Sequence, residues 1–218
     1  MRHRATDRGE SEVTSGIVPL AGAEEERVGR FLARAFKGDP IFLHVLPDAG
    51  ERVRFLERFM AALARRSRMF SVAWTTAPEA VGVSLWKGPE LGALSDAQLA
   101  ACGLDRIPEW LAPDALARLD RLFDAVDASL EADEPGPRWY LGVLGVAPEW
   151  QGKGLGSRLA ACGLERADRE GLPVTLETSE AKNLPLYRRL GFEVLRELGR
   201  EATGGPTVWT LRRPPRPR

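Results

Sequence analysis

Apolar residues spaced three or four positions apart predict amphipathic helices in the first half of the chain. In residues 24–36 and 49–67 they fall on one side of a helix, a pattern typical of helices that pack on a core. The tripeptide Gly38-Asp39-Pro40 is predicted to end the first of these helices. Two further helices are expected at residues 95–102 and 113–132.

Short apolar runs between turn-forming residues predict the strands of a sheet. They lie at residues 16–20, 70–74, 80–86, 139–146, 174–177, 192–198 and 207–211. Helices are expected at residues 154–170 and 184–190, so strands and helices alternate in the second half of the chain. This alternation predicts an α/β fold of packed layers.

Composition narrows the class of protein. The 218 residues are 44% hydrophobic, which is ordinary for a globular protein, and Lys plus Arg equals Asp plus Glu at 31 each. A balanced charge predicts neither nucleic acid nor an anionic membrane as a partner. The two cysteines, Cys102 and Cys162, and the two histidines form no metal-binding pattern, so we expect no metal.

The chain is expected to form one domain over residues 16–212. The polar residues 1–15 are predicted to be a disordered tail, and residues 213–218, which alternate basic residues with proline, a loose tail. No apolar run approaches the ~20 residues that span a bilayer, and the N-terminus lacks the apolar centre of a secretion signal. We therefore expect a cytoplasmic monomer or homodimer.

A glycine-rich loop joins the strand at 139–146 to the helix at 154–170. In Gln151-Gly152-Lys153-Gly154-Leu155-Gly156-Ser157 the glycines leave backbone N–H groups free at a helix N-terminus, where the helix dipole favours an anion. This arrangement predicts pyrophosphate binding. A nucleotide P-loop does not fit, because Gly154 follows Gly152-Lys153 where Ser or Thr is needed. A dinucleotide fingerprint fits weakly, since Ser157 takes the place of its last glycine.

This loop resembles the acyl-coenzyme A loop of the GNAT family of N-acetyltransferases. The pattern of that loop is matched by Gln151, Gly154 and Gly156. The family's second motif is matched by Asn183, Tyr187 and Gly191-Phe192. Within the family, residues 138–212 look most like the puromycin N-acetyltransferase-like proteins. Residues 88–137 match nothing recognisable, so the resemblance does not identify the acceptor.

The resemblance implies a mixed, mostly antiparallel central sheet of about six or seven strands, flanked by helices and splayed at its two central strands. It also implies that acetyl-coenzyme A is the co-substrate. Its pantetheine would pair with the backbone of the splayed strand, in the manner of an added strand. The residues expected to bind it are Leu144, Gly145, Val146, Gln151, Gly152, Lys153, Gly154, Leu155, Gly156, Ser157, Asn183 and Tyr187.

Tyr187 and Glu177 are the candidate catalytic residues. The resemblance implies that Tyr187 protonates the departing thiolate, although a tyrosine at this place could also simply pack in the core. Glu177 could deprotonate the amine, anchor a cationic substrate, or form a structural ion pair. The Val146 N–H is the candidate donor to the oxyanion of the tetrahedral intermediate. Trp139 and Tyr140 are candidates for the acceptor pocket, and strand alternation directs one of the two to the core.

The resulting hypothesis is direct transfer of acetyl to a primary amine of a small molecule in a ternary complex. An aminonucleoside or another antibiotic-like amine is a plausible acceptor, and antibiotic resistance a possible role. Two alternatives stay open at this point. One is an acetyltransferase of protein N-termini or lysines, and the other is a non-catalytic acyl-coenzyme A-binding regulatory module on the same fold.

Overall fold

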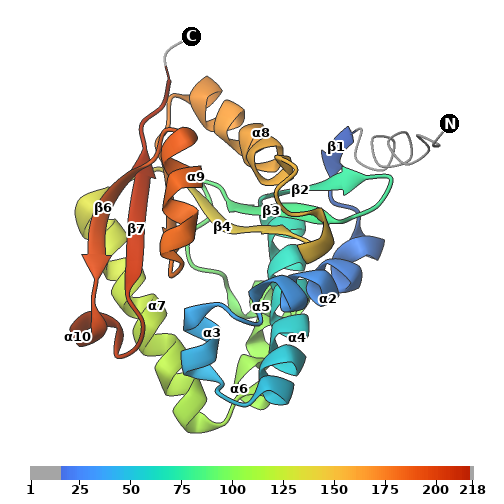
Figure 1. Cartoon of the computed structure of the whole chain (residues 1–218), viewed down its shortest axis with the longest axis vertical. Coiled ribbons are helices and arrows are strands. Elements are labelled where there is room, and N and C mark those ends of the chain that lie inside the picture. Colours follow the sequence, from blue (N-terminus) through green and yellow to red (C-terminus); the bar gives the residue numbers. More distant parts are fainter. Residues whose placement is uncertain (1–15, 217–218) are drawn as a thin grey trace, which may run out of the picture.

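A computed structural model describes residues 16–216, and the predicted disordered tail at 1–15 lies outside them. One twisted sheet forms the centre and helices cover it (Figure 1). The strands are β1 (Gly16–Pro19), β2 (Val72–Ala77), β3 (Gly82–Lys87), β4 (Trp139–Val146), β5 (Val174–Thr178), β6 (Glu193–Leu198) and β7 (Val208–Arg213). The helices are α2 (Glu25–Phe36), α3 (Pro40–Val45), α4 (Ala49–Phe70), α5 (Asp96–Cys102), α6 (Ile107–Trp110), α7 (Pro113–Asp133), α8 (Leu155–Glu170), α9 (Leu184–Arg189) and α10 (Arg200–Thr203).

The strand order in the sheet is β1-β2-β3-β4-β5-β7-β6, and every neighbouring pair except β4 and β5 is antiparallel. This confirms the predicted mixed, mostly antiparallel sheet. The parallel pairing of β4 with β5 comprises only Trp139 with Val174 and Tyr140 with Thr175. Beyond Tyr140 the two strands share no register, so the side of β4 that faces β5 is open toward Val146.

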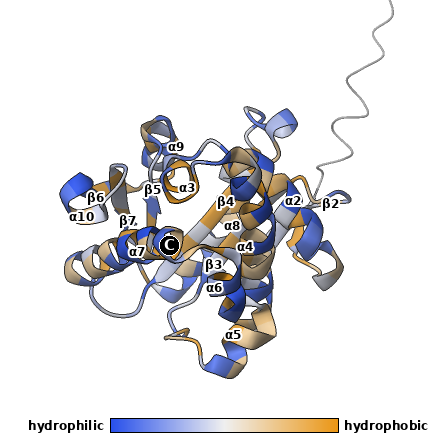
Figure 2. Ribbon diagram, turned by 90° about the horizontal axis from the view of Figure 1, so that it is seen from below, coloured by the Kyte–Doolittle hydropathy of each residue, from blue (hydrophilic) through white to orange (hydrophobic). Residues whose placement is uncertain are grey.

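The helices form a layer on each face of the sheet. Helix α8 packs on β3 and β4 from one face, where an added Cβ at Gly163 would come within 2.2 Å of Trp86. Helices α2 and α4 cover the other face and approach each other closely, because Gly29 lies against the Glu57 carbonyl and the Ala61 side chain. Apolar colours run along β4 at the centre, and hydrophilic colours gather on outer helices such as α10 (Figure 2).

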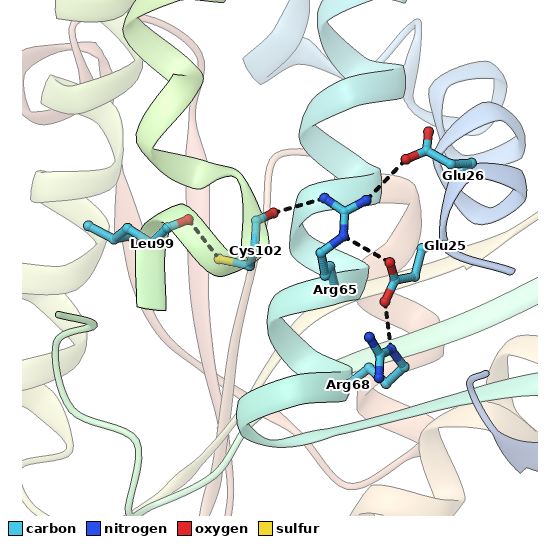
Figure 3. A network of polar contacts seen from close by, with 6 residues as sticks. All are labelled: Glu25, Glu26, Arg65, Arg68, Leu99 and Cys102. Carbon is cyan, nitrogen blue, oxygen red and sulfur yellow. Dashed lines mark hydrogen bonds and ion pairs between the residues drawn. The ribbon is translucent and has the colours of Figure 1, made fainter. Parts of the chain in front are cut away.

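The chain between β3 and β4 forms α5, α6 and α7, of which α7 packs on β6 and β7 and α5 packs on α4. A polar network holds α5 in place (Figure 3). Arg65 of α4 donates to Glu25 of α2 at 2.9 Å, to Glu26 at 3.0 Å and to the main-chain carbonyl of Cys102 at 3.1 Å. Arg68 donates to the second oxygen of Glu25 at 2.5 Å. The network therefore ties the end of α5 to the α2–α4 pair.

Three short helices and some boundaries differ from the expectations. Gly38-Asp39-Pro40 was expected only to stop a helix, but it also starts α3, because the Asp39 carboxylate accepts the Ile41 N–H at 2.9 Å and Pro40 fits the first turn. Helices α6 and α10 were not predicted; each has only four residues, too few to show periodicity. Helix α4 continues to Phe70, so β2 begins at Val72 and not at residue 70.

The C-terminal end is more ordered than expected. Arg213, placed by the sequence in a loose tail, is the last residue of β7 and is buried. Its guanidinium pairs with the Asp168 carboxylate at 2.7 and 2.8 Å, and the Arg216 N–H bonds the same carboxylate at 2.8 Å. In the described part of the chain, residues 16–216, no helix has the length and apolar character needed to cross a membrane.

Candidate active site

A cavity of about 570 Å³ lies where β4 and β5 separate. The structure brings four of the predicted site residues to its wall: Leu144, Glu177, Asn183 and Tyr187. The predicted residues 151–157 do not line it, because the glycine-rich loop lies beyond the end of β4, at the start of α8. The cavity and the loop are thus two parts of one candidate site, joined by the unpaired side of β4.

A bulge in β4 sets the direction of its side chains. Leu85 pairs with Val143 and Trp86 with Leu141, so Gly142 is the extra residue. Before the bulge, Tyr140 faces the cavity while Trp139 is buried against Trp86. The prediction that only one of Trp139 and Tyr140 points to the pocket is therefore confirmed, and Tyr140 is that residue.

The end of β4 offers an unpaired backbone donor to the opening between the strands. The Ala147 N–H bonds the Val81 carbonyl on the β3 side at 2.7 Å. Because successive amides of a strand point in opposite directions, the Val146 N–H points to the open side. The Gln151 side chain donates to the Val146 carbonyl at 3.0 Å, so this oxygen already has a partner. Gln151 thereby fixes the glycine-rich loop to the strand.

The glycine-rich loop leaves open space next to the start of α8. Gly152 and Gly154 have φ of +77° and +78°, and a Cβ added to either would meet no atom within 4 Å. The first N–H group of α8 with a helical partner is that of Arg158, which bonds the Gly154 carbonyl at 3.3 Å, so the N–H groups before it in the first turn have no helical partners. The side chain of Leu155 is buried, so only its backbone can contact a ligand. Lys153 lies with its Nζ 4.6 Å from the centre of the Trp150 ring.

Glu177 projects from β5 into the cavity and accepts a hydrogen bond from the Tyr140 hydroxyl. Burial, together with the charges of Asp127 and Asp39, raises the pKa of Glu177 to about 7, although the Tyr140 hydrogen bond opposes the shift. Burial and the Glu177 charge also raise the pKa of Tyr140 well above its usual value, so Tyr140 stays a hydrogen-bond donor. Glu177 therefore gains and loses a proton near neutral pH.

Replacing Glu177 with Gln is expected to raise the free energy of unfolding relative to the wild type, and to raise it more at pH 8 than at pH 5. The folded-state pKa of about 7 lies above the unfolded value of 4.5, so folding favours the protonated form and wild-type stability falls as pH rises between these values. The fall amounts to at most about 3 kcal/mol. Urea unfolding at both pH values measures it, with Glu165→Gln on the exposed side of α8 as the control. A pH-independent difference would contradict the raised pKa.

Tyr187 reaches the cavity from α9. Its ring is buried and packs edge-on against Phe192 with 5.9 Å between ring centres. Within residues 16–216 its hydroxyl has no hydrogen-bond partner, although it borders the cavity. Burial, followed by the charges of Glu177 and Asp39, raises the pKa of Tyr187 above its usual value, so the phenol is protonated at neutral pH. Asn183, which precedes α9, donates to the Thr178 hydroxyl at 3.5 Å.

Six charged residues of the cavity were not predicted from the sequence, and these are Asp39, Arg66, Lys87, Asp127, Glu131 and Arg138. Asp39 caps α3 and accepts a hydrogen bond from the Ser179 hydroxyl at 2.9 Å, which links α3 to the end of β5. The Asp39-Pro40 pair was a usable signal of a helix start, but nothing in the sequence directs it to β5. Arg66 and Asp127 lie in long helices, where a charged residue usually faces solvent. Among the described residues no group of side chains could hold a metal ion.

Comparison with known proteins agrees with this geometry. Residues 68–192 match the Acetyltransferase (GNAT) family. An uncharacterized N-acetyltransferase of Schizosaccharomyces pombe is 28% identical over 171 residues, which cover 74% of this chain and 67% of that protein.

Solved structures show the same fold. A crystal structure titled histone acetyltransferase HPA2 and related acetyltransferase, from Corynebacterium glutamicum, has a TM-score of 0.62 at 21% identity, covering 92% of this chain and 96% of that one. The polyamine N-acetyltransferase of Drosophila melanogaster has a TM-score of 0.60 at 16% identity, covering 91% and 100%. The family match extends over more than half of the chain, and the protein therefore belongs to the GNAT family of acetyltransferases.

Proposed function

We propose that this protein transfers the acetyl group of acetyl-coenzyme A to the primary amine of a small molecule, directly and within a ternary complex. The observation that carries the proposal is the meeting of Glu177 and Tyr187 in one cavity, beside the unpaired end of β4. The Glu177 carboxylate suits removal of a proton from the amine, and the Tyr187 hydroxyl suits donation of a proton to the thiolate. Membership of the family supports acetyl-coenzyme A as the co-substrate.

Glu177 is proposed to take a proton from the ammonium form of the acceptor, since only the free amine has a nucleophilic lone pair. The carboxylate can do this above a pH of about 7, where it is ionised. The amine then attacks the thioester carbonyl carbon, and a C–N bond forms. The Val146 N–H is proposed to stabilise the oxyanion of this tetrahedral intermediate, because it points into the opening between β4 and β5.

Collapse of the intermediate breaks the C–S bond, and Tyr187 is proposed to protonate the leaving sulfur. The second proton that the nitrogen loses restores the Tyr187 hydroxyl. A phenol with a raised pKa is a weaker acid than an ordinary thiol, whose pKa is about 8.5. Full transfer ahead of bond breaking would therefore be uphill, and we propose that the proton moves as the C–S bond breaks.

The glycine-rich loop is proposed to hold the pyrophosphate of the co-substrate, so a methyl group there should weaken binding. We expect Gly154→Ala to raise the Kd of acetyl-coenzyme A about tenfold, or about 1.4 kcal/mol, measured by calorimetry. Gly171→Ala is the matched control, because Gly171 also has a positive φ, of +67°, and open space around it, but lies at the far end of α8. Equal losses of affinity in the two variants would point to strain and not to contact with the ligand.

The function is tested by incubating the protein with acetyl-coenzyme A and a panel of primary amines, with thiol release as the readout. The panel contains arylalkylamines, polyamines, aminonucleosides, and peptides with free N-termini or lysines. Acetylation of small amines alone supports the proposal, and preferred acetylation of peptides would replace it with a protein acetyltransferase. Tight binding of acetyl-coenzyme A without transfer to any amine would favour the regulatory module. The likeness to puromycin N-acetyltransferase-like proteins, and with it an antibiotic acceptor, stays a prediction that the same panel examines.

A further inference from the structure

Arg66 brings to the cavity a positive charge that is not paired directly with any protein group among the described residues. It lies on α4 and lines the cavity, and its Nε is fully buried without a hydrogen-bond partner. Within residues 16–216 its guanidinium makes no hydrogen bond or ion pair. Two other arginines of the same helix differ in this respect: Arg52 donates to three main-chain carbonyls, and Arg65 binds two carboxylates and a carbonyl.

The buried Nε of Arg66 is costly to leave without a partner, because it has lost its water and gained nothing in return, whereas the two terminal nitrogens border the cavity. An arginine cannot escape this cost by releasing its proton, since it stays charged even where burial lowers its pKa, as it does for Arg66. Such a group in a ligand cavity is typical of a residue whose partner is an oxygen of the ligand. Its planar donors suit a carbonyl or carboxylate group.

Arg66 lies beside the Tyr140–Glu177 pair. A Cβ placed on Gly142, the bulge residue of β4, would be 3.1 Å from the Tyr140 ring and 3.6 Å from a terminal nitrogen of Arg66. Tyr140 in turn donates its hydroxyl proton to Glu177. The cavity thus presents a carboxylate and a guanidinium as close neighbours that are not paired with each other. A ligand that carries an amine and an oxygen acceptor a short distance apart can bind both.

Part of the remaining wall is apolar, although Lys87, Asp127, Glu131 and Arg138 also line the cavity. The segment between β3 and β4 contributes six apolar side chains to it, and these are Leu91, Leu99, Leu104, Ile107, Phe123 and Leu130. They provide a surface for a bulky apolar group, whose burial adds to the affinity.

From these three features, and resting on the function proposed above, we infer that the acceptor is an α-amino acyl compound with a bulky apolar side chain. Its amine meets Glu177, its carbonyl or carboxylate oxygen accepts from Arg66, and its side chain lies on the apolar wall. In such a compound two carbon atoms separate the nitrogen from the oxygen, which suits neighbouring subsites. Arg66 is in this view a specificity-determining residue and takes no part in the transfer itself.

The test compares three acceptors of similar size: phenylalaninamide, phenylalanine and phenethylamine, which lacks the carbonyl group. We expect the wild type to acetylate one or both of the first two with a kcat/KM at least ~10-fold above that of phenethylamine. A preference for phenylalanine would show that Arg66 binds a carboxylate, and a preference for its amide would show that it binds a neutral carbonyl. Equal values for all three, or the highest value for phenethylamine, would overturn the inference and leave the proposed function standing.

Arg66→Met should remove this preference. The ratio of kcat/KM for the preferred phenylalanine compound to kcat/KM for phenethylamine should then lie within about twofold of one. Arg58→Met is the matched control, because Arg58 lies on the same helix but is exposed, and its ratio should equal that of the wild type. Arg66→Lys keeps the charge without the planar fork and should keep only part of the preference. An Arg66→Met enzyme with the wild-type ratio would contradict a contact between Arg66 and the acceptor.

A binding measurement separates failure of this inference from failure of the proposed function. Calorimetry with N-acetylphenylalaninamide and N-acetylphenethylamine needs no turnover. Both carry the acetyl group, but only the first carries the carboxamide carbonyl oxygen that is proposed to accept from Arg66. We expect the wild type to bind N-acetylphenylalaninamide at least ~10-fold more tightly than N-acetylphenethylamine. The Arg66→Met variant should bind the two compounds with equal affinity. If no amine is acetylated but this difference is found, the proposed function fails and the oxygen subsite stands. If the two bind equally or not at all, the subsite is refuted.

Discussion

Tyr187→Phe is expected to lower kcat about 100-fold or more while the Kd of acetyl-coenzyme A stays nearly unchanged. The change removes one oxygen, and the ring keeps its packing against Phe192. The hydroxyl has no partner among the described residues, so its loss orphans no buried group. Its contribution belongs to kcat because the proton reaches the sulfur only as the C–S bond breaks. Steady-state kinetics with a competent acceptor, together with calorimetry for the co-substrate, measure both quantities.

Tyr140→Phe makes the same chemical change at another tyrosine of the cavity, on β4, and serves as the comparison. The Tyr140 hydrogen bond lowers the pKa of Glu177, so its loss should move the midpoint of the pH–rate profile upward. Tyr187→Phe should instead lower the plateau and leave the midpoint in place. If Tyr187→Phe retained a near-normal kcat, water would be the proton donor to the sulfur and Tyr187 would only shape the cavity.

Glu177→Gln is the second change with a large expected effect. In the wild type, kcat/KM should rise as pH increases through about 7, because Glu177 must lose its proton before it can accept one from the amine. The Gln variant cannot accept a proton, and its kcat/KM at pH 8 should be about 100-fold lower. Its profile should lack the step near 7 and should follow only the ionisation of the acceptor. Initial rates between pH 5.5 and 9.5 test this.

Two other outcomes would assign Glu177 a different role. A higher KM at every pH with the step near 7 retained would make Glu177 an anchor for the ammonium group and not its base. Full activity of the Gln variant would make the carboxylate a purely structural partner of Tyr140. The Gln variant keeps an acceptor for the Tyr140 hydroxyl, so misfolding is not expected to obscure the result.

The parts of the site that the sequence predicted are those that depend on the backbone. Positive φ at Gly152 and Gly154 requires glycine, so the shape of the loop is visible in the residue types. Glu177 and Tyr187 were named because each stands in a stretch that resembles the family; the structure places both at the cavity, and their catalytic roles stay predictions. The strands were found because apolar residues cluster between turn-forming residues, most clearly in β4, although the mostly exposed β6 also carries charged residues.

The parts that the sequence did not predict depend on tertiary contacts. Arg66 occupies an ordinary helical position, and only the placement of α4 over the Gly142 bulge brings it into the cavity. Arg65, one residue earlier, looks equivalent in the sequence but is fully engaged in the network with Glu25 and Glu26. Whether a helical arginine is paired or free is decided by its partners on other elements, and no local pattern records them.

The attachment of α5 to α4 has a consequence for how such a protein can diversify. Arg65 holds α5 by the main-chain oxygen of Cys102, an atom that every residue possesses. Substitutions along the segment between β3 and β4 can therefore alter the apolar wall without releasing its anchor. The groups proposed for transfer come from β4, β5 and α9, outside that segment. Natural drift or laboratory selection confined to residues 88–137 could thus redirect the enzyme to new acceptors while its chemistry is inherited intact.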